Sequence, residues 1–167
     1  AWLTVDRFDN DELRFWEHFA ASVDAAVPGF RERTAAALRE LAGGGRDAFL
    51  FHFINELART GETLDVVLDD YHHITNRNIH DMVAYVLDRL PPGYRFVAAS
   101  RTEPELPLPR LMARGQLLRL GGEELAFTEP EGWEFGRIVL PGMPLSHIRE
   151  LLGRAEGWFA GVKLSLP

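Results

Sequence analysis

Short apolar runs alternate along this sequence with longer stretches in which apolar residues recur at helical spacing. Short continuous apolar runs are typical of strands buried in a parallel sheet, and strands that alternate with helices form such sheets. The pattern therefore predicts an α/β fold, in which a parallel sheet is flanked by helices on both faces. The predicted strands cover residues 2–6, 64–70, 95–100 and 117–120.

The segments between these runs carry the signals of helix ends. Asp9, with Glu12 three residues later, has the form of a capping box that opens the first helix. Pro28 suits the first turn of a second helix, and the glycines at 43–45 would end it. Further helices are predicted over about residues 46–60, 79–90 and 109–114.

From residue 127 onward only helix signals remain. Thr128 and Ser146 can each cap a short helix, although Gly132 and Gly136 weaken the first of the two. We therefore expect an α/β core over residues 1–126 and the start of a truncated helical subdomain over residues 127–167. A last helix is predicted around Trp158, Phe159 and Val162.

The composition excludes several classes of protein. A chain of 167 residues can bury one full core with a small appendage. The absence of Cys excludes disulfide scaffolds, cysteine zinc sites and thiol nucleophiles. The formal net charge of -7 argues against a general nucleic-acid clamp, which needs a basic patch. The apolar runs are too short to span a bilayer, so no membrane partner is expected.

The basic residues are 17 Arg and a single Lys, Lys163, which Leu164 follows. A phosphate-binding loop of the form G-x-x-x-x-G-K-[ST] requires a Lys followed by Ser or Thr. The sequence therefore contains no such loop.

Two acids, Asp69 and Asp70, end the apolar run that begins at residue 64. This is the form of a Walker B strand, since a buried parallel strand delivers carboxylates to the sheet edge where ligands of α/β folds bind. One acid can hold the water shell of Mg²⁺, and the other can polarise an attacking water. The alternative is a strand that simply ends in a solvated acidic turn.

The next predicted strand, residues 95–100, is followed by Arg101. At the same edge of the sheet, an arginine can reach the γ-phosphate of a nucleotide, which is the task of a sensor 1 residue. The alternative is an arginine that only offsets the charge of Asp69 or Asp70 across the edge.

Five blocks of the sequence carry a family resemblance. They are residues 2–6 with 9–11 and 14–16; 68–74 with 79–80; 90–92 with 99–104 and 106–108; 111–118 with 125–128; and 156–161. In this order and spacing, they resemble the nucleotide-binding domain of MalT-like regulators, and the resemblance extends over nearly the whole chain. These regulators are large ATP-dependent transcriptional activators of the LuxR type, within the STAND branch of the P-loop ATPases.

The resemblance implies a nucleotide switch with the activity of a weak ATPase. Asp69 and Asp70 would be the catalytic Walker B acids, with Asp69 holding Mg²⁺ through water, and Arg101 would contact the bound ATP. ATP and a small-molecule inducer together would drive self-association. DNA would be bound by a helix-turn-helix region outside this chain, in a cytoplasmic protein.

The sequence departs from this family in two places. The strand and loop of the Walker A motif, expected just before Trp2, are absent, so we expect a fragment that binds nucleotide poorly alone. Family sheets place that strand beside the strand at 95–100, so an incomplete or rearranged sheet is predicted. Residues 131–136 are also rich in glycine where the family has a plain helix. The alternative function is a non-catalytic α/β module that binds other proteins.

Overall fold

A computed structural model describes residues 1–61, 63–139, 142–154 and 158. Contacts within the chain divide it into two compact units, Ala1–Leu108 and Pro109–Pro167. Each unit has a buried apolar cluster of its own. The functional boundary predicted near Ala126 stays a prediction.

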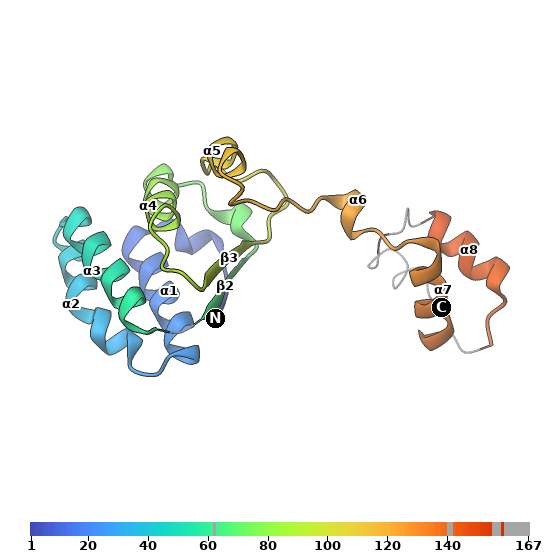
Figure 1. Ribbon diagram of the computed structural model, residues 1–167, viewed down its shortest axis with the longest axis horizontal. Helices are drawn as coiled ribbons and strands as arrows, with labels where there is room; N and C mark the ends of the chain where they lie inside the picture. Colours follow the sequence, from blue (N-terminus) through green and yellow to red (C-terminus); the bar gives the residue numbers. More distant parts are fainter. Residues whose placement is uncertain (62, 140–141, 155–157, 159–167) are drawn as a thin grey trace. The chain divides into compact units, whose positions relative to one another are not determined.

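Three parallel strands form the sheet of the first unit, which confirms the α/β fold class (Figure 1). They are β1 (Trp2–Thr4), β2 (Leu64–Asp69) and β3 (Tyr94–Ala98), in the order β1-β2-β3. The register aligns Trp2 with Val67, and Val67 with Val97.

Four helices and two short 3₁₀ segments connect the strands. The helices are α1 (Glu12–Ala26), α2 (Phe30–Ala42), α3 (Arg46–Arg59) and α4 (Arg77–Leu87); the 3₁₀ segments are η1 (Arg7–Asn10) and η2 (Tyr71–His73). The Asp9 capping box was predicted to open the first helix, and this prediction is wrong. Asp11 caps α1 instead, because Asp9 lies within η1 and accepts a hydrogen bond from the Asp6 N–H.

The helices cover one face of the sheet, and Figure 1 shows them on one side of β2 and β3. Alternate strand residues such as Val66 and Leu68 belong to the core, whereas Trp2 is 62% and Val97 48% exposed. The expected helices on the second face are missing from the described part of this unit. The reason is topological: the strand order follows the chain order, so right-handed crossovers all return over the same face.

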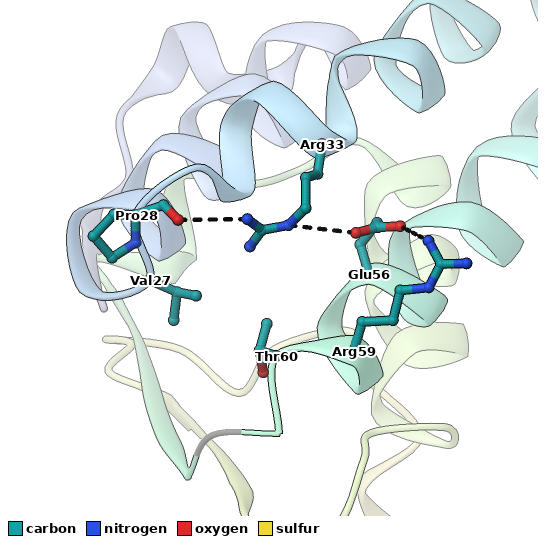
Figure 2. A pocket seen from close by; sticks show the side chains of 6 residues that line it. All are labelled: Val27, Pro28, Arg33, Glu56, Arg59 and Thr60. Carbon is teal, nitrogen blue, oxygen red and sulfur yellow. Dashed lines mark hydrogen bonds and ion pairs between the residues drawn. The ribbon is translucent and has the colours of Figure 1, made fainter.

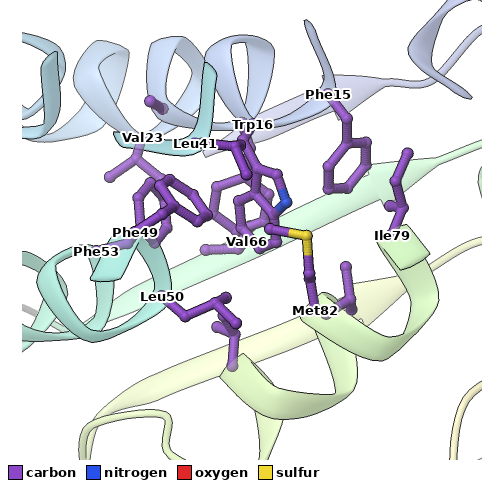
Figure 3. Packing of buried hydrophobic residues seen from close by; sticks show 14 of the residues in the cluster. Phe15, Trp16, Val23, Leu41, Phe49, Leu50, Phe53, Val66, Ile79 and Met82 are labelled. Carbon is purple, nitrogen blue, oxygen red and sulfur yellow. The ribbon is translucent and has the colours of Figure 1, made fainter. Parts of the chain in front are cut away.

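The core between helices and sheet is rich in aromatic side chains. Figure 3 shows Trp16 of α1 beside Phe49 and Phe53 of α3, with Val66 of the sheet close to them. The Trp16 ring centroid lies 5.2 Å from that of Phe49 and 5.1 Å from that of Phe53, both in edge-to-face geometry. Such pairs add to the free energy that burial of the rings supplies. The core therefore fixes β2 against α1 and α3.

The predicted strand at residues 117–120 is wrong, since these residues form no regular secondary structure. A strand exists only where a neighbour accepts and donates its backbone hydrogen bonds. None of the described strands pairs with this segment, and Leu118 is 81% exposed.

The second unit is helical in its described residues. Its helices are α5 (Leu108–Ala113), α6 (Gly122–Leu125), α7 (Glu129–Val139) and α8 (Leu145–Arg154). Gly132 and Gly136, which appeared to weaken α7, are buried where it meets α8. A Cβ at Gly136 would lie 2.7 Å from the Ile148 side chain, so the glycines permit the close approach of the two helices.

The helix predicted around Phe159 and Val162 lies outside the described residues. Among the described helices, none has the length and apolar character needed to cross a membrane.

Candidate functional site at the carboxyl edge of the sheet

The carboxyl ends of the three strands meet at one edge of the sheet. The Val5 N–H, just after β1, donates to the Asp69 carbonyl at 2.9 Å, and the Tyr71 N–H donates to the Ala99 carbonyl at the same distance. These two bonds bring the ends of all three strands together around Asp69 and Asp70. The structure therefore brings the predicted acidic pair and the stretch that leads to Arg101 to the same edge.

Asp69 is the last residue of β2 and is half-buried. Side chains alternate along a strand, so Asp69 lies on the same face as Val67, which the helices leave uncovered. Its Oδ1 accepts a hydrogen bond of 3.0 Å from the Asp70 N–H. The second carboxylate oxygen forms no hydrogen bond within the described chain and is available to a ligand.

Asp70 has a left-handed backbone conformation with φ 57°, which no other non-glycine residue of the described chain adopts. This conformation costs an L-residue about 1–2 kcal/mol, although Asp tolerates it better than most. The Asp70 carbonyl accepts a hydrogen bond of 3.0 Å from the His73 N–H, which closes η2. Such strained residues persist where surrounding contacts determine them, and they often occur at functional sites.

No arginine neutralises either carboxylate within the described chain. The nearest basic group is Nδ1 of His72, 3.7 Å from Asp70 Oδ1. Arg101 is exposed and forms no ion pair with Asp69 or Asp70 among the described residues. Among the described residues, the two adjacent carboxylates therefore have no arginine partner, and His72 is the basic side chain beside them.

Two carboxylates of this kind suit a hard divalent cation. Mg²⁺ prefers oxygen ligands and is commonly bound through one or two carboxylates while it keeps several waters. The half-buried oxygens of Asp69 and Asp70 match that preference, and they lie where ligands of open α/β sheets bind. No group of three or more acidic or histidine side chains gathers as a metal site among the described residues, so an ion at this edge would have two carboxylates and would keep most of its waters.

Sequence reasoning missed Asn10, which joins η1 to the segment after η2. Its side chain forms hydrogen bonds with residues 63 to 66 positions away along the chain. The only signal was the run Asp9-Asn10-Asp11, in which all three residues are plausible caps.

A second missed feature is the buried pair of Tyr71 and His80. The Tyr71 hydroxyl lies 3.0 Å from His80 Nδ1. Burial raises the pKa of the Tyr71 hydroxyl, and burial lowers the pKa of His80 against smaller opposing effects of Glu105, Ile74 and Asp81. Both shifts favour the uncharged form of the group, which matches a hydroxyl donating to an unprotonated ring nitrogen.

A shallow pocket lies away from this edge, between α2 and α3 (Figure 2). Its central carboxylate, Glu56, is paired with Arg59 at 2.6 Å and with Arg33 at 3.5 Å. Thr60, another lining residue, precedes the amino end of β2. Because its charges are already paired, this pocket is less suited to a new ligand than the carboxyl edge.

Comparison with known proteins finds relatives of this chain. The HTH-type transcriptional regulator MalT of Serratia proteamaculans (strain 568) is 32% identical to the chain over 165 residues. This chain is similar to part of a transcriptional regulator. The match covers 98% of the chain and 18% of the regulator's length, which supports the resemblance to MalT-like regulators. No family model matches the chain.

Proposed function

We propose that this chain is part of the ATP-binding domain of a MalT-like transcriptional activator, in which the bound nucleotide switches self-association. The observation that carries this proposal is the Asp69–Asp70 pair, which lies at the carboxyl edge of a parallel sheet without a neutralising arginine. The similarity of nearly the whole chain to MalT supports it independently.

Each residue of the edge has a separate role in this proposal. Bound Mg²⁺–ATP supplies the phosphoryl group and its electrophilic phosphorus. Asp69 would hold the ion through its water ligands. Asp70 orients the attacking water, and the exposed Arg101 donates to phosphate oxygens as negative charge develops on them. From the resemblance to this family, we expect hydrolysis to be slow and to reset the switch.

The phosphate-binding loop has to come from outside these 167 residues, since their sequence contains none. Within the described chain β3 pairs only with β2, so its second edge can accept a further parallel strand. We propose that another part of the regulator, or a second copy, supplies that strand and loop. Residues 1–167 alone then bind ATP weakly.

The remaining parts of the switch lie elsewhere in the protein. A small-molecule inducer and ATP together promote self-association in the cytoplasm, and DNA is bound by a separate region. The net charge of -7 agrees with this division, because a DNA-binding surface would need excess basic residues.

Calorimetric titration of the intact regulator with ATP, with and without Mg²⁺, tests the proposal. The variants Asp69→Asn and Asp70→Asn keep the size of the side chain and remove its charge. Each should lower the Mg²⁺-dependent affinity by about tenfold or more, because a hydrogen bond to a charged group contributes about that much to binding. Asp81→Asn, on the exposed surface of α4, is the matched control and should leave the affinity unchanged.

One observation favours a second function, that of a non-catalytic protein-binding module. The uncovered face of the sheet presents the exposed side chains of Trp2 and Val97 in one row. Exposed apolar surface of this kind can mark an interface. No ATP binding by the intact wild-type regulator, or unchanged affinity in both Asp variants, would favour this function over the nucleotide switch.

A further inference from the structure

Asn10, the last residue of η1, uses all of its side-chain hydrogen-bonding groups. Its Oδ1 accepts from the Thr75 N–H at 2.7 Å, the Asn76 N–H at 3.0 Å and the Thr75 hydroxyl at 3.2 Å. Its Nδ2 donates to the carbonyls of His73 at 2.8 Å and Arg7 at 3.0 Å. The Asn10 side chain thus binds the backbone of Arg7 in η1, of His73 in η2, and of the two residues just before α4.

The orientation of this amide follows from its partners. Two backbone N–H groups face Oδ1 and two carbonyls face Nδ2, so a flipped amide would oppose donor to donor and acceptor to acceptor. The Asn76 side chain adds a return bond of 2.9 Å from its Nδ2 to the Asn10 carbonyl. No other residue type of this length offers both two donors and an acceptor.

The segment that Asn10 holds begins at the acidic pair. From Asp70 to Asn76 the chain passes through the left-handed residue and η2 before α4 starts. Its first residues are anchored to β3 by the bond from the Tyr71 N–H to the Ala99 carbonyl. Its last residues, Thr75 and Asn76, are joined to η1 by their hydrogen bonds with Asn10. The Asn10 bonds therefore hold the far end of this segment, from His73 to Asn76.

We propose that Asn10 is a positioning residue for the carboxylate of Asp70. It binds residues 73–76, at the far end of the segment that starts at Asp70, and so helps to set where that carboxylate meets Mg²⁺–ATP, an inference that rests on the proposed function. Asn10 itself touches neither the nucleotide nor the ion.

The first experiment needs no nucleotide and measures whether Asn10 protects the amides of Thr75 and Asn76. Hydrogen exchange of the intact protein is compared between wild type and Asn10→Ala. Exchange of the Thr75 and Asn76 amides should rise by about tenfold, because each loses its acceptor. Asn78→Ala is the matched control: this exposed asparagine donates to Glu12 and should leave both amides protected. Unchanged exchange in Asn10→Ala would overturn the inference.

The second experiment measures positioning through the magnesium dependence of ATP binding. Asn10→Ala should lower ATP affinity about tenfold in the presence of Mg²⁺ and leave the Mg²⁺-free affinity unchanged. A loss of folded protein would instead reduce the number of binding sites in both conditions. Equal affinities of variant and wild type with Mg²⁺ would overturn the positioning role.

A second variant guards against failure of Asn10→Ala to fold. Asn10→Asp keeps the oxygen that accepts from Thr75 and Asn76 but loses the donors to His73 and Arg7. It should keep the two amides protected and still weaken Mg²⁺-dependent binding. If wild type binds no ATP at all, the proposed function fails, while the exchange experiment still decides whether Asn10 protects the two amides.

Discussion

The Tyr71 hydroxyl lies 3.0 Å from Nδ1 of His80, and the two side chains are 0% and 3% exposed. Tyr71 follows the acidic pair directly, and His80 belongs to the helix that comes next. The contact therefore joins the residue that follows Asp70 to α4. A hydroxyl can donate to Nδ1 only while this nitrogen is unprotonated, so protonation of His80 in acid would break the contact.

The stability of the protein should fall in mild acid because of His80. Burial lowers the pKa of this imidazole, so its folded pKa is below the ordinary value of 6.5. Below pH 6.5 the unfolded chain binds the proton first, and the free energy of unfolding falls until the pH passes the folded pKa. The largest possible slope is about 1.4 kcal/mol per pH unit from this one group.

Urea unfolding at pH 7.5, 6.5 and 5.5 measures this effect. The control is His80→Gln, which has no proton to gain and should show a flatter dependence than wild type over the same interval. Parallel pH curves for the two proteins would show that His80 contributes nothing to acid sensitivity.

Tyr71→Phe tests the hydroxyl of the same pair. The variant keeps the ring and leaves His80 Nδ1 without its hydrogen-bond partner in a buried place. An unsatisfied buried group costs about 1–3 kcal/mol, so the free energy of unfolding at pH 7.5 should fall by that amount. Tyr85→Phe, on the surface of α4, is the control and should lie within about 0.5 kcal/mol of wild type.

The strands and helices of the first unit could be predicted because each follows from local residue types. The run at 64–69 is apolar enough to be recognised without knowledge of its neighbours. Residues 117–120 have a similar pattern, but a strand also needs a partner, and none of the described strands pairs with them. The uncovered face of the sheet could not be foreseen either, since it depends on strand order.

The candidate site likewise contains residues that the sequence could place and one that it could not. Asp69 and Asp70 could be placed at the sheet edge because the end of a strand fixes their position. Asn10 could not be identified, because all its side-chain partners but Arg7 lie more than 60 residues away and its neighbours Asp9 and Asp11 are equally good caps. Long-range polar contacts leave no periodic signal in a sequence.

Asp70→Gly should separate stability from binding. Glycine adopts φ 57° without the steric penalty of a Cβ, so the folded state loses strain, although the unfolded chain gains entropy. We expect the free energy of unfolding to change by less than about 1 kcal/mol, while Mg²⁺-dependent ATP affinity falls. Asp70→Val removes the same carboxylate but adds strain, because a β-branched side chain tolerates positive φ less well than Asp, and should unfold at lower temperature than Asp70→Gly. Equal melting temperatures for the two variants would contradict the strain argument.

The packing of α7 on α8 can be tested with two alanine substitutions. A Cβ at Gly132 would collide with the Leu152 side chain, whereas a Cβ at Gly153 would meet nothing within 4 Å. Gly132→Ala should therefore destabilise the second unit by about 1–3 kcal/mol, the usual cost of overpacking. Gly153→Ala lies in the last turn of α8 and should stabilise the helix by up to about 1 kcal/mol, because alanine has the higher helix propensity. Hydrogen exchange of α7 and α8 amides reports both effects, with faster exchange in the first variant and slower exchange in the second. Equal protection in the two variants would mean that Gly132 does not set the distance between these helices.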